Sequence, residues 1–139
     1  MKSWPLQTNK LRGAFTLVEL IVVVLILGIL AAVALPKFVN QTDTAKLNGS
    51  LQSLSVLRTA IDTYRVNNTG YPTTATLPTA LATYLRGNFP SPAVGANAGS
   101  STVVASAASP PTTTSGGAGW VYNQTTGEIA INDASYISY

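Results

Sequence analysis

The chain has 139 residues, of which 9% are charged, and its formal net charge is +3. Typical soluble domains have a charged fraction of roughly 25%. The absence of cysteine excludes disulfides and thiolate metal sites, and the absence of histidine excludes Ser-His-Asp catalysis and imidazole-bound zinc. The remaining acids, bases and hydroxyls are scattered along the chain. Because they form no convergent catalytic set, the sequence argues against an enzyme.

The excess of positive charge lies at the N-terminus. Lys2, Lys10 and Arg12 precede residue 14, and beyond it the basic and acidic residues balance. Nucleic-acid binding requires clustered Lys and Arg on the folded part of a protein. We therefore expect no nucleic-acid partner.

A long apolar segment follows these basic residues. From Phe15 to Leu35 the only charged residue is Glu19. A helix of this length spans about 31 Å, which matches a bilayer core of roughly 30 Å. The basic residues before it predict a cytoplasmic N-terminus and a C-terminal part on the other side of the membrane. Two alternatives are a plain signal-anchor helix and a secretory signal cleaved at the Ala-x-Ala site at 32–34.

Glu19 is the unusual residue of this segment, because an unpaired charge inside a membrane costs several kcal/mol. One interpretation is that its carboxylate reaches the interface, which lies only one helical turn away. The residues around it support a second interpretation.

The sequence "RGAFTLVEL", followed by an apolar run and a proline, resembles the N-terminal motif of type IV pilins and type II secretion pseudopilins. The resemblance implies that residues 1–14 are a cytoplasmic leader, removed by a prepilin peptidase that cuts between Ala14 and Phe15. It also implies that the new N-terminal Phe15 is methylated. The family usually has glycine before the cleaved bond, whereas here Gly13 lies one residue further upstream. Cleavage after Gly13 would leave Ala14 first and change the spacing to Glu19.

The same resemblance implies a role in assembly for Glu19 and Pro36. Cleavage creates an ammonium group at Phe15 in apolar surroundings, and a carboxylate four residues along neutralises an amine of its own chain or of a neighbour. The resemblance implies the amine of a neighbouring subunit, within a filament core built from helices 15–36. Pro36 is expected to kink the helix or melt it locally, because proline lacks a backbone donor.

Residues 37–139 are expected to form a globular domain. An apolar stripe with spacings of three and four predicts that the long helix continues and packs on this domain: Leu47, Leu51, Leu54, Leu57, Ile61 and Tyr64. The helix is expected to end near Asn67–Gly70 with a left-handed cap. A second, short helix is expected between an N-cap at Thr76 and a C-cap at Gly87, with Leu77, Leu81, Tyr84 and Leu85 buried.

The C-terminal part is expected to contain β-structure. The uncharged stretch at about 91–118 predicts a flexible loop, with a short strand at "STVVA". "GWVYNQTTGEIAIN" predicts a hairpin whose strands cover the long helix. The fold class is thus α+β: a long N-terminal helix packed on a small C-terminal antiparallel sheet, in a pilin-like arrangement.

The globular part resembles that of the major type II secretion pseudopilins, in which a calcium ion orders the C-terminal region. Asp133, with oxygens of Asn132 and Ser135, is the candidate ligand set here. One carboxylate falls far short of the ligands of an EF-hand, so loss of the site is at least equally expected. No other cofactor is expected.

Together these resemblances imply a structural subunit of a pilus-like filament, most directly a type II secretion pseudopilin anchored by one span in the inner membrane. Expected partners are membrane lipid, further copies of the chain, the prepilin peptidase and methyltransferase, the inner-membrane assembly platform, and minor pilins or pseudopilins. The alternatives are a subunit of a type IV pilus or competence pilus, and a membrane-tethered exported domain that binds sugar or protein.

Overall fold

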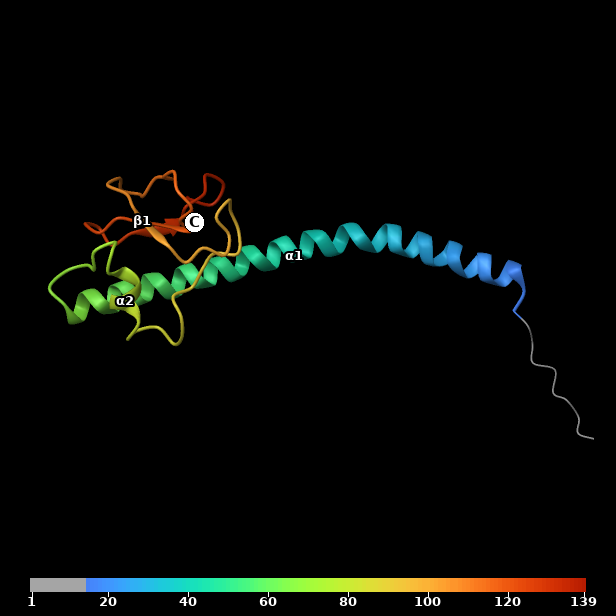
Figure 1. Ribbon diagram of the computed structural model, residues 1–139, viewed down its shortest axis with the longest axis horizontal. Helices are drawn as coiled ribbons and strands as arrows, with labels where there is room; N and C mark the ends of the chain where they lie inside the picture. Colours follow the sequence, from blue (N-terminus) through green and yellow to red (C-terminus); the bar gives the residue numbers. More distant parts are fainter. Residues whose placement is uncertain (1–14) are drawn as a thin grey trace, which may run out of the picture. The chain divides into compact units, whose positions relative to one another are not determined.

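The computed structural model describes residues 15–139, without the side chains of residues 35–37, 39 and 40 (Figure 1). The expected leader, with Gly13 and Ala14, lies outside the described residues. The chain divides between Val39 and Asn40 into two compact units. The helix α1, Leu17–Asn67, passes from the first unit into the second. Its assignment is continuous at Pro36, so the local melting that the proline made possible is not observed.

In the first unit, α1 presents apolar side chains in every direction. Every residue from Phe15 to Val33 is exposed. Leu17–Ala34 is long and apolar enough to cross a membrane. An apolar surface of this extent is not stable in water, so it must be covered by lipid or by other chains. The predicted apolar helix is therefore confirmed, and it indicates membrane anchoring.

In the second unit, α1 lies beside the sheet (Figure 1), and the side chains of its apolar stripe join the core cluster. Leu54, Leu57 and Ile61 are almost completely buried, and Leu47 and Tyr64 pack at the edges of the same cluster. The predicted stripe is thus confirmed as the helix contribution to the core, except for Leu51, which is half-buried and lies outside this cluster. The small polar residue Ser50 is buried on the same side of the helix.

The end of α1 differs from the predicted cap. The helix ends at Asn67 as expected, but no non-glycine residue that the structure describes has a positive φ, and Gly70 is not among the glycines that do. Side-chain amides cap the helix instead. Asn67 Nδ2 donates to Thr63 O at 3.0 Å, and Asn68 Nδ2 donates to Tyr64 O at 2.8 Å. Each bond runs from a side-chain amide to the carbonyl four residues earlier, so the two asparagines attach to the last turns of the helix.

The second helix is shorter than predicted. The helix α2 spans Leu77–Leu81, begins after Thr76 without a side-chain cap, and has its C-cap at Ala82 rather than at Gly87. Leu77 and Leu81 are buried in the core, while Tyr84 and Leu85 pack against it from the turns that follow. The predicted apolar side is therefore correct, but half of it belongs to turns.

The three strands form one small sheet in the order β1-β2-β3. β2, Trp120–Tyr122, and β3, Ile129–Ile131, form the predicted antiparallel hairpin, with Tyr122 opposite Ile129. β1, Val103–Ala105, lies in the predicted "STVVA" segment but pairs with β2 in parallel. The sheet is therefore mixed, and the expectation of a purely antiparallel sheet is wrong. Parallel pairing is possible because residues 106–119 are long enough to cross over.

The core is formed where the sheet meets α1 and α2. Trp120, Tyr122, Ile129 and Ile131 belong to one buried cluster with the leucines of the two helices. The polar atoms of the two aromatic residues are paired: Trp120 Nε1 donates to Pro90 O at 2.8 Å, and Tyr122 Oη donates to Pro72 O at 3.1 Å. Burial, with smaller contributions from Tyr71 and Tyr64, raises the pKa of Tyr122 to about 12. The hydroxyl therefore stays protonated and donates at neutral pH.

The hairpin turn depends on a glycine. Gly127 has a φ of +79° and lies against the ring of Tyr71, which a Cβ at position 127 would overlap. Its backbone N–H donates to Asn123 O at 2.8 Å, which closes the turn. Only glycine combines this φ with this close approach.

The Tyr122 hydrogen bond gives a test of the packing. Tyr122→Phe should lower the free energy of unfolding by about 1–3 kcal/mol, because the buried Pro72 carbonyl loses its donor. Thermal unfolding of the full chain in detergent, followed by near-UV circular dichroism, measures the change. Tyr139→Phe removes a hydroxyl from an exposed side chain and is the matched control. Equal melting temperatures for the two variants would contradict the assigned role of this bond.

Candidate functional site

The start of α1 contains the residues of the predicted processing and assembly motif. Phe15 and Glu19 are both exposed, and Glu19 lies in the first turn of the helix. A carboxylate in the first turn is favourable because it interacts with the positive end of the helix dipole. The structure is that of the uncleaved chain, so the expected Phe15 ammonium group does not exist in it. The pairing of Glu19 with that amine stays a prediction for the cleaved protein.

Thr16 is a residue at this site that the sequence analysis missed. Its Oγ1 accepts a hydrogen bond from the backbone N–H of Glu19 at 3.2 Å, and its carbonyl accepts from Leu20 N at 3.3 Å. Thr16 is therefore the N-cap of α1. The signal in the sequence was the pattern Thr-x-x-Glu, which is typical of a capping box. An N-cap of this kind contributes about 1 kcal/mol to helix stability, so Thr16 fixes the turn that carries Glu19.

One face of the apolar helix includes the small residues Gly28 and Ala32, and we refer to it as the shallow face. A groove of about 580 Å³ follows residues spaced by about four along this face: Leu20, Ile21, Val24, Leu25, Gly28, Ile29 and Ala32. A Cβ added at Gly28 would contact nothing within 4 Å. Gly28 and Ala32 form a small-xxx-small pair, a pattern that lets helices approach closely in membranes. This face is suited to contact with another helix.

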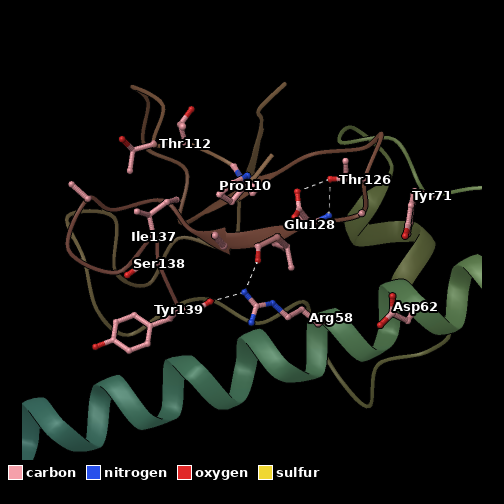
Figure 2. Close-up of a pocket in the computed structure, with 16 residues that line it drawn as sticks. Arg58, Asp62, Tyr71, Pro110, Thr112, Thr126, Glu128, Ile137, Ser138 and Tyr139 are labelled. Atoms are coloured by element: carbon pink, nitrogen blue, oxygen red, sulfur yellow. Dashed lines mark hydrogen bonds between the residues drawn. The ribbon is translucent and has the colours of Figure 1, made fainter. Parts of the chain in front are cut away.

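The second unit contains a larger groove beside the edge strand β3 (Figure 2). It has a volume of about 840 Å³ and is bounded by α1, by β3 with its preceding turn, by the loop 110–113 and by residues 134–139. Arg58 reaches across it from α1. Its Nη2 donates to Ile129 O at 3.2 Å and to the main-chain oxygen of Tyr139 at 2.6 Å. The guanidinium group thus joins the helix to the edge of the sheet and to the C-terminal segment.

Glu128, one of two acidic residues that line this groove, is held by hydrogen bonds from its neighbours. Glu128 Oε2 accepts hydrogen bonds from Ser109 Oγ at 2.6 Å and from Thr126 Oγ1 at 2.8 Å. These two bonds hold the pKa of Glu128 below its ordinary value, so the side chain is ionised at neutral pH. The Glu128 carboxylate and the Arg58 guanidinium are thus engaged in contacts that tie segments together.

The candidate calcium residues lie together at the end of β3, but their polar atoms do not fit a cation. Asp133 Oδ2 accepts from Ala96 N at 2.9 Å, and Asp133 Oδ1 accepts from Ser135 N at 2.9 Å. These backbone bonds, that of Ala96 first, hold the pKa of Asp133 below its ordinary value. Asn132 Nδ2 donates to two carbonyls, those of Thr114 at 3.1 Å and Ala118 at 3.0 Å. Within the described residues, no group of three or more His, Cys, Asp or Glu side chains could hold a metal ion.

Comparison with known proteins identifies the N-terminal motif. Residues 9–35 match a family model described as the prokaryotic N-terminal methylation motif. This match confirms the prepilin-type resemblance that was inferred from "RGAFTLVEL". The matched range includes Gly13, Ala14, Phe15 and Glu19.

Similarity extends to proteins of one secretion system. Type II secretion system core protein G of Pseudomonas aeruginosa is 40% identical over 63 residues, which cover 45% of this chain and 44% of the relative. The protein of the same name from Escherichia coli is 37% identical over 67 residues, which cover 48% and 46% of the two chains. That from Vibrio cholerae is 39% identical over 63 residues, which cover 45% and 43%. The chain thus spans less than half of the length of these curated relatives.

No solved structure matches the chain. The name of these relatives describes a core component of a secretion system. The chain therefore carries a prepilin-type N-terminal methylation motif that runs into a helix able to cross a membrane, and it is similar to type II secretion system core protein G.

Proposed function

We propose that the chain is a structural subunit of a type IV pilus-like filament, most directly a type II secretion pseudopilin. The observation that supports this most strongly is the methylation motif at residues 9–35, joined to an apolar helix whose side chains are exposed from Phe15 to Val33. A single anchor needs lipid around it, whereas a filament core needs the same surface for contact between copies. A subunit that moves from membrane to filament uses one surface for both purposes.

The proposed order of events begins in the inner membrane. The helix spans the membrane with residues 1–14 in the cytoplasm and the second unit in the periplasm. A prepilin peptidase removes the leader at the Ala14–Phe15 bond and a methyltransferase methylates Phe15. The cleaved subunits then enter a filament through the assembly platform, together with minor pseudopilins. No enzymatic activity is part of this role.

Within the filament, Glu19 neutralises the Phe15 ammonium group of a neighbouring copy. The exposed position of Glu19 in the first turn supports a contact with another chain. Thr16 supports it as well, because the cap fixes the backbone that carries the carboxylate. The shallow face at Gly28 and Ala32 allows a neighbouring helix to approach closely. Pro36 lies at the end of this segment and, as a proline, allows the helix to adapt its direction when subunits pack.

Two other roles share the same motif. A subunit of a type IV pilus or of a competence pilus would also be processed at Phe15. The similarity to core protein G favours the secretion system over both kinds of pilus. A tethered binding domain would use the second unit alone. The groove beside β3 is bridged by Arg58, which favours a structural role for that groove.

Processing gives the first test. Mass spectrometry of the protein made together with a prepilin peptidase should show loss of residues 1–14 and an N-methylated Phe15. Gly13→Ala should leave this product unchanged, because Gly13 is not adjacent to the proposed bond. A mature N-terminus at Ala14, or one beyond Ala34, would contradict the proposal. Abolished cleavage in Gly13→Ala would place the bond after Gly13.

Assembly gives the second test. Glu19→Gln keeps the size of the side chain but removes its charge, so the Phe15 ammonium group would be left unpaired in apolar surroundings. Since such a charge costs several kcal/mol and each 1.4 kcal/mol is about a factor of ten, filament yield should fall at least about tenfold. Membrane insertion and leader cleavage should be unchanged.

The control for this experiment is Asp43→Asn, which removes one exposed carboxylate from α1 outside the apolar segment. It should assemble like the unmodified chain, as judged by the amount of sheared filament on an immunoblot. If Glu19→Gln assembled as well as this control, the charge pair would not be required.

A further inference from the structure

Residues 91–118 form a long uncharged segment that must satisfy its own backbone polar groups. Side chains supply many of the partners. Asn97 Nδ2 donates to Gly116 O at 3.2 Å and to Ala118 O at 3.0 Å. Ser100 Oγ donates to Gly117 O at 2.7 Å. Consecutive carbonyls of this part of the chain therefore each accept a bond from a side chain that lies 14 to 21 residues away.

Two of these side chains meet at one atom. Asn97 Nδ2 and Asn132 Nδ2 both donate to Ala118 O, each at 3.0 Å. We refer to this arrangement of Asn97, Ala118 and Asn132 as the amide bridge. It joins the loop before β1, the residues just before β2 and the end of β3. Three segments that are distant in sequence are thereby held by one carbonyl and two amides.

The orientation of the Asn132 amide follows from its partners. Its Oδ1 accepts from Thr114 N at 2.9 Å while its Nδ2 donates to Thr114 O at 3.1 Å. The opposite orientation would place the amide oxygen against two carbonyl oxygens, those of Thr114 and Ala118. Asn132 is 5% exposed, so water does not relieve such a contact. The group directed at these carbonyls is therefore a donor.

A calcium ion, which the pseudopilin resemblance implies for this region, would need carbonyl and carboxylate oxygens that are directed at the ion and not at N–H groups. Calcium takes six to eight oxygen ligands, commonly carboxylate and backbone carbonyl oxygens. Here the carbonyls of Thr114, Gly116 and Ala118 face amide N–H groups, and both oxygens of Asp133 face backbone N–H groups. Among the described residues, one buried hydroxyl nearby, Thr114 Oγ1, has no partner, and a single hydroxyl does not make a calcium site.

Asp133 fixes the segment that carries Asn97. Its Oδ2 binds Ala96 N, directly before Asn97. Gly95 has a φ of +88°, and a Cβ there would lie 2.9 Å from Asp133 Cβ. The turn is therefore packed on Asp133 as closely as glycine allows. The carboxylate that was the candidate calcium ligand positions one half of the amide bridge.

From these contacts we propose that the amide bridge takes the structural role of a cation in this domain, so that the fold of residues 91–118 is independent of divalent metal ions. The two amide groups provide N–H donors where an ion would provide positive charge, and the carbonyl oxygens are satisfied in either case. This inference does not rest on filament assembly, since a chain that failed to assemble would still show it.

The first experiment compares metal conditions. The full chain in detergent is unfolded thermally in EDTA, in calcium chloride and in magnesium chloride, with near-UV circular dichroism as the readout. Equal melting temperatures, within about 1 °C, are expected. A rise of several degrees that is specific to calcium and reversed by EDTA would overturn the proposal.

The second experiment changes the bridge. Asn132→Asp keeps the shape of the side chain but replaces the donor with a carboxylate oxygen that faces two carbonyls. Loss of two buried donor contacts should lower the melting temperature by about 8–16 °C in EDTA for a domain of this size. Hydrogen exchange of residues 91–118 should become faster. Asn88→Asp adds the same charge at an exposed loop position and should leave both measurements unchanged.

Asn97→Ala keeps the test valid if Asn132→Asp does not fold. This variant removes the two hydrogen bonds that Asn97 Nδ2 donates to Gly116 O and Ala118 O, and it buries no charge. Hydrogen exchange of residues 114–118 should therefore be faster than in the unmodified chain. If Asn97→Ala and Asn132→Asp both showed the exchange and the melting temperature of the unmodified chain, the amide bridge would not be what holds this segment.

Discussion

The need to cover apolar surface governs both units of this protein, and α1 meets it in two ways. Between Leu54 and Ile61 the helix has one buried apolar side, and Trp120, Tyr122, Ile129 and Ile131 pack with it in one cluster. Before Val33 it is apolar on all sides and exposed throughout. Burial contributes roughly 25 cal/mol per Å² in both cases. The second unit obtains this stabilisation within its own chain, and the first obtains it from lipid or from other chains.

The scarcity of charge has consequences for the second unit. With few ionic groups, the loops between α2 and β2 are tied down by amides, hydroxyls and single carboxylates that bind backbone atoms. Ser50 is an example, since its Oγ donates to Lys46 O and accepts from Ala93 N, both at 2.8 Å, and so connects α1 to the start of the long segment. Asn123 does the same at the hairpin, where Nδ2 donates to Ala108 O at 2.9 Å and Oδ1 accepts from Thr125 N at 2.9 Å. Such bonds are short-range and little affected by salt, unlike pairs of surface charges.

The sequence predicted the features that depend on periodicity and local turn chemistry. The stripe from Leu47 to Tyr64, the strand in "STVVA" and the antiparallel hairpin closed at Gly127 each have a local signal. The parallel pairing of β1 with β2 has none, because it depends on how residues 106–119 cross over. The length of α2 was not predicted correctly. The role of the Asn67 and Asn68 side chains at the end of α1 was also missed, because glycine and asparagine can both end a helix.

In the candidate site, too, features with a local sequence signal could be predicted and long-range contacts could not. Glu19 was found because an acid in an apolar helix is conspicuous, whereas Thr16 was overlooked although the Thr-x-x-Glu pattern was present. Asp133 was found as a carboxylate and Ser135 as its neighbour, but the partner Ala96 could not be predicted from the sequence because it lies 37 residues away. Whether a carboxylate binds a metal or a backbone amide is decided by such long-range contacts and not by its own identity.

The two carboxylates, Glu19 and Asp133, illustrate how the partner of an acid determines its function. Asp133 receives two backbone N–H groups from its own chain, so its charge is satisfied once the domain has folded. Glu19 is exposed in the first helical turn, and the helix dipole compensates its charge only in part. In the proposed subunit its full partner, the ammonium group of Phe15, comes into existence only when the leader is removed. An uncleaved chain then lacks the charge that would pair with its neighbours' Glu19, which would keep assembly dependent on processing.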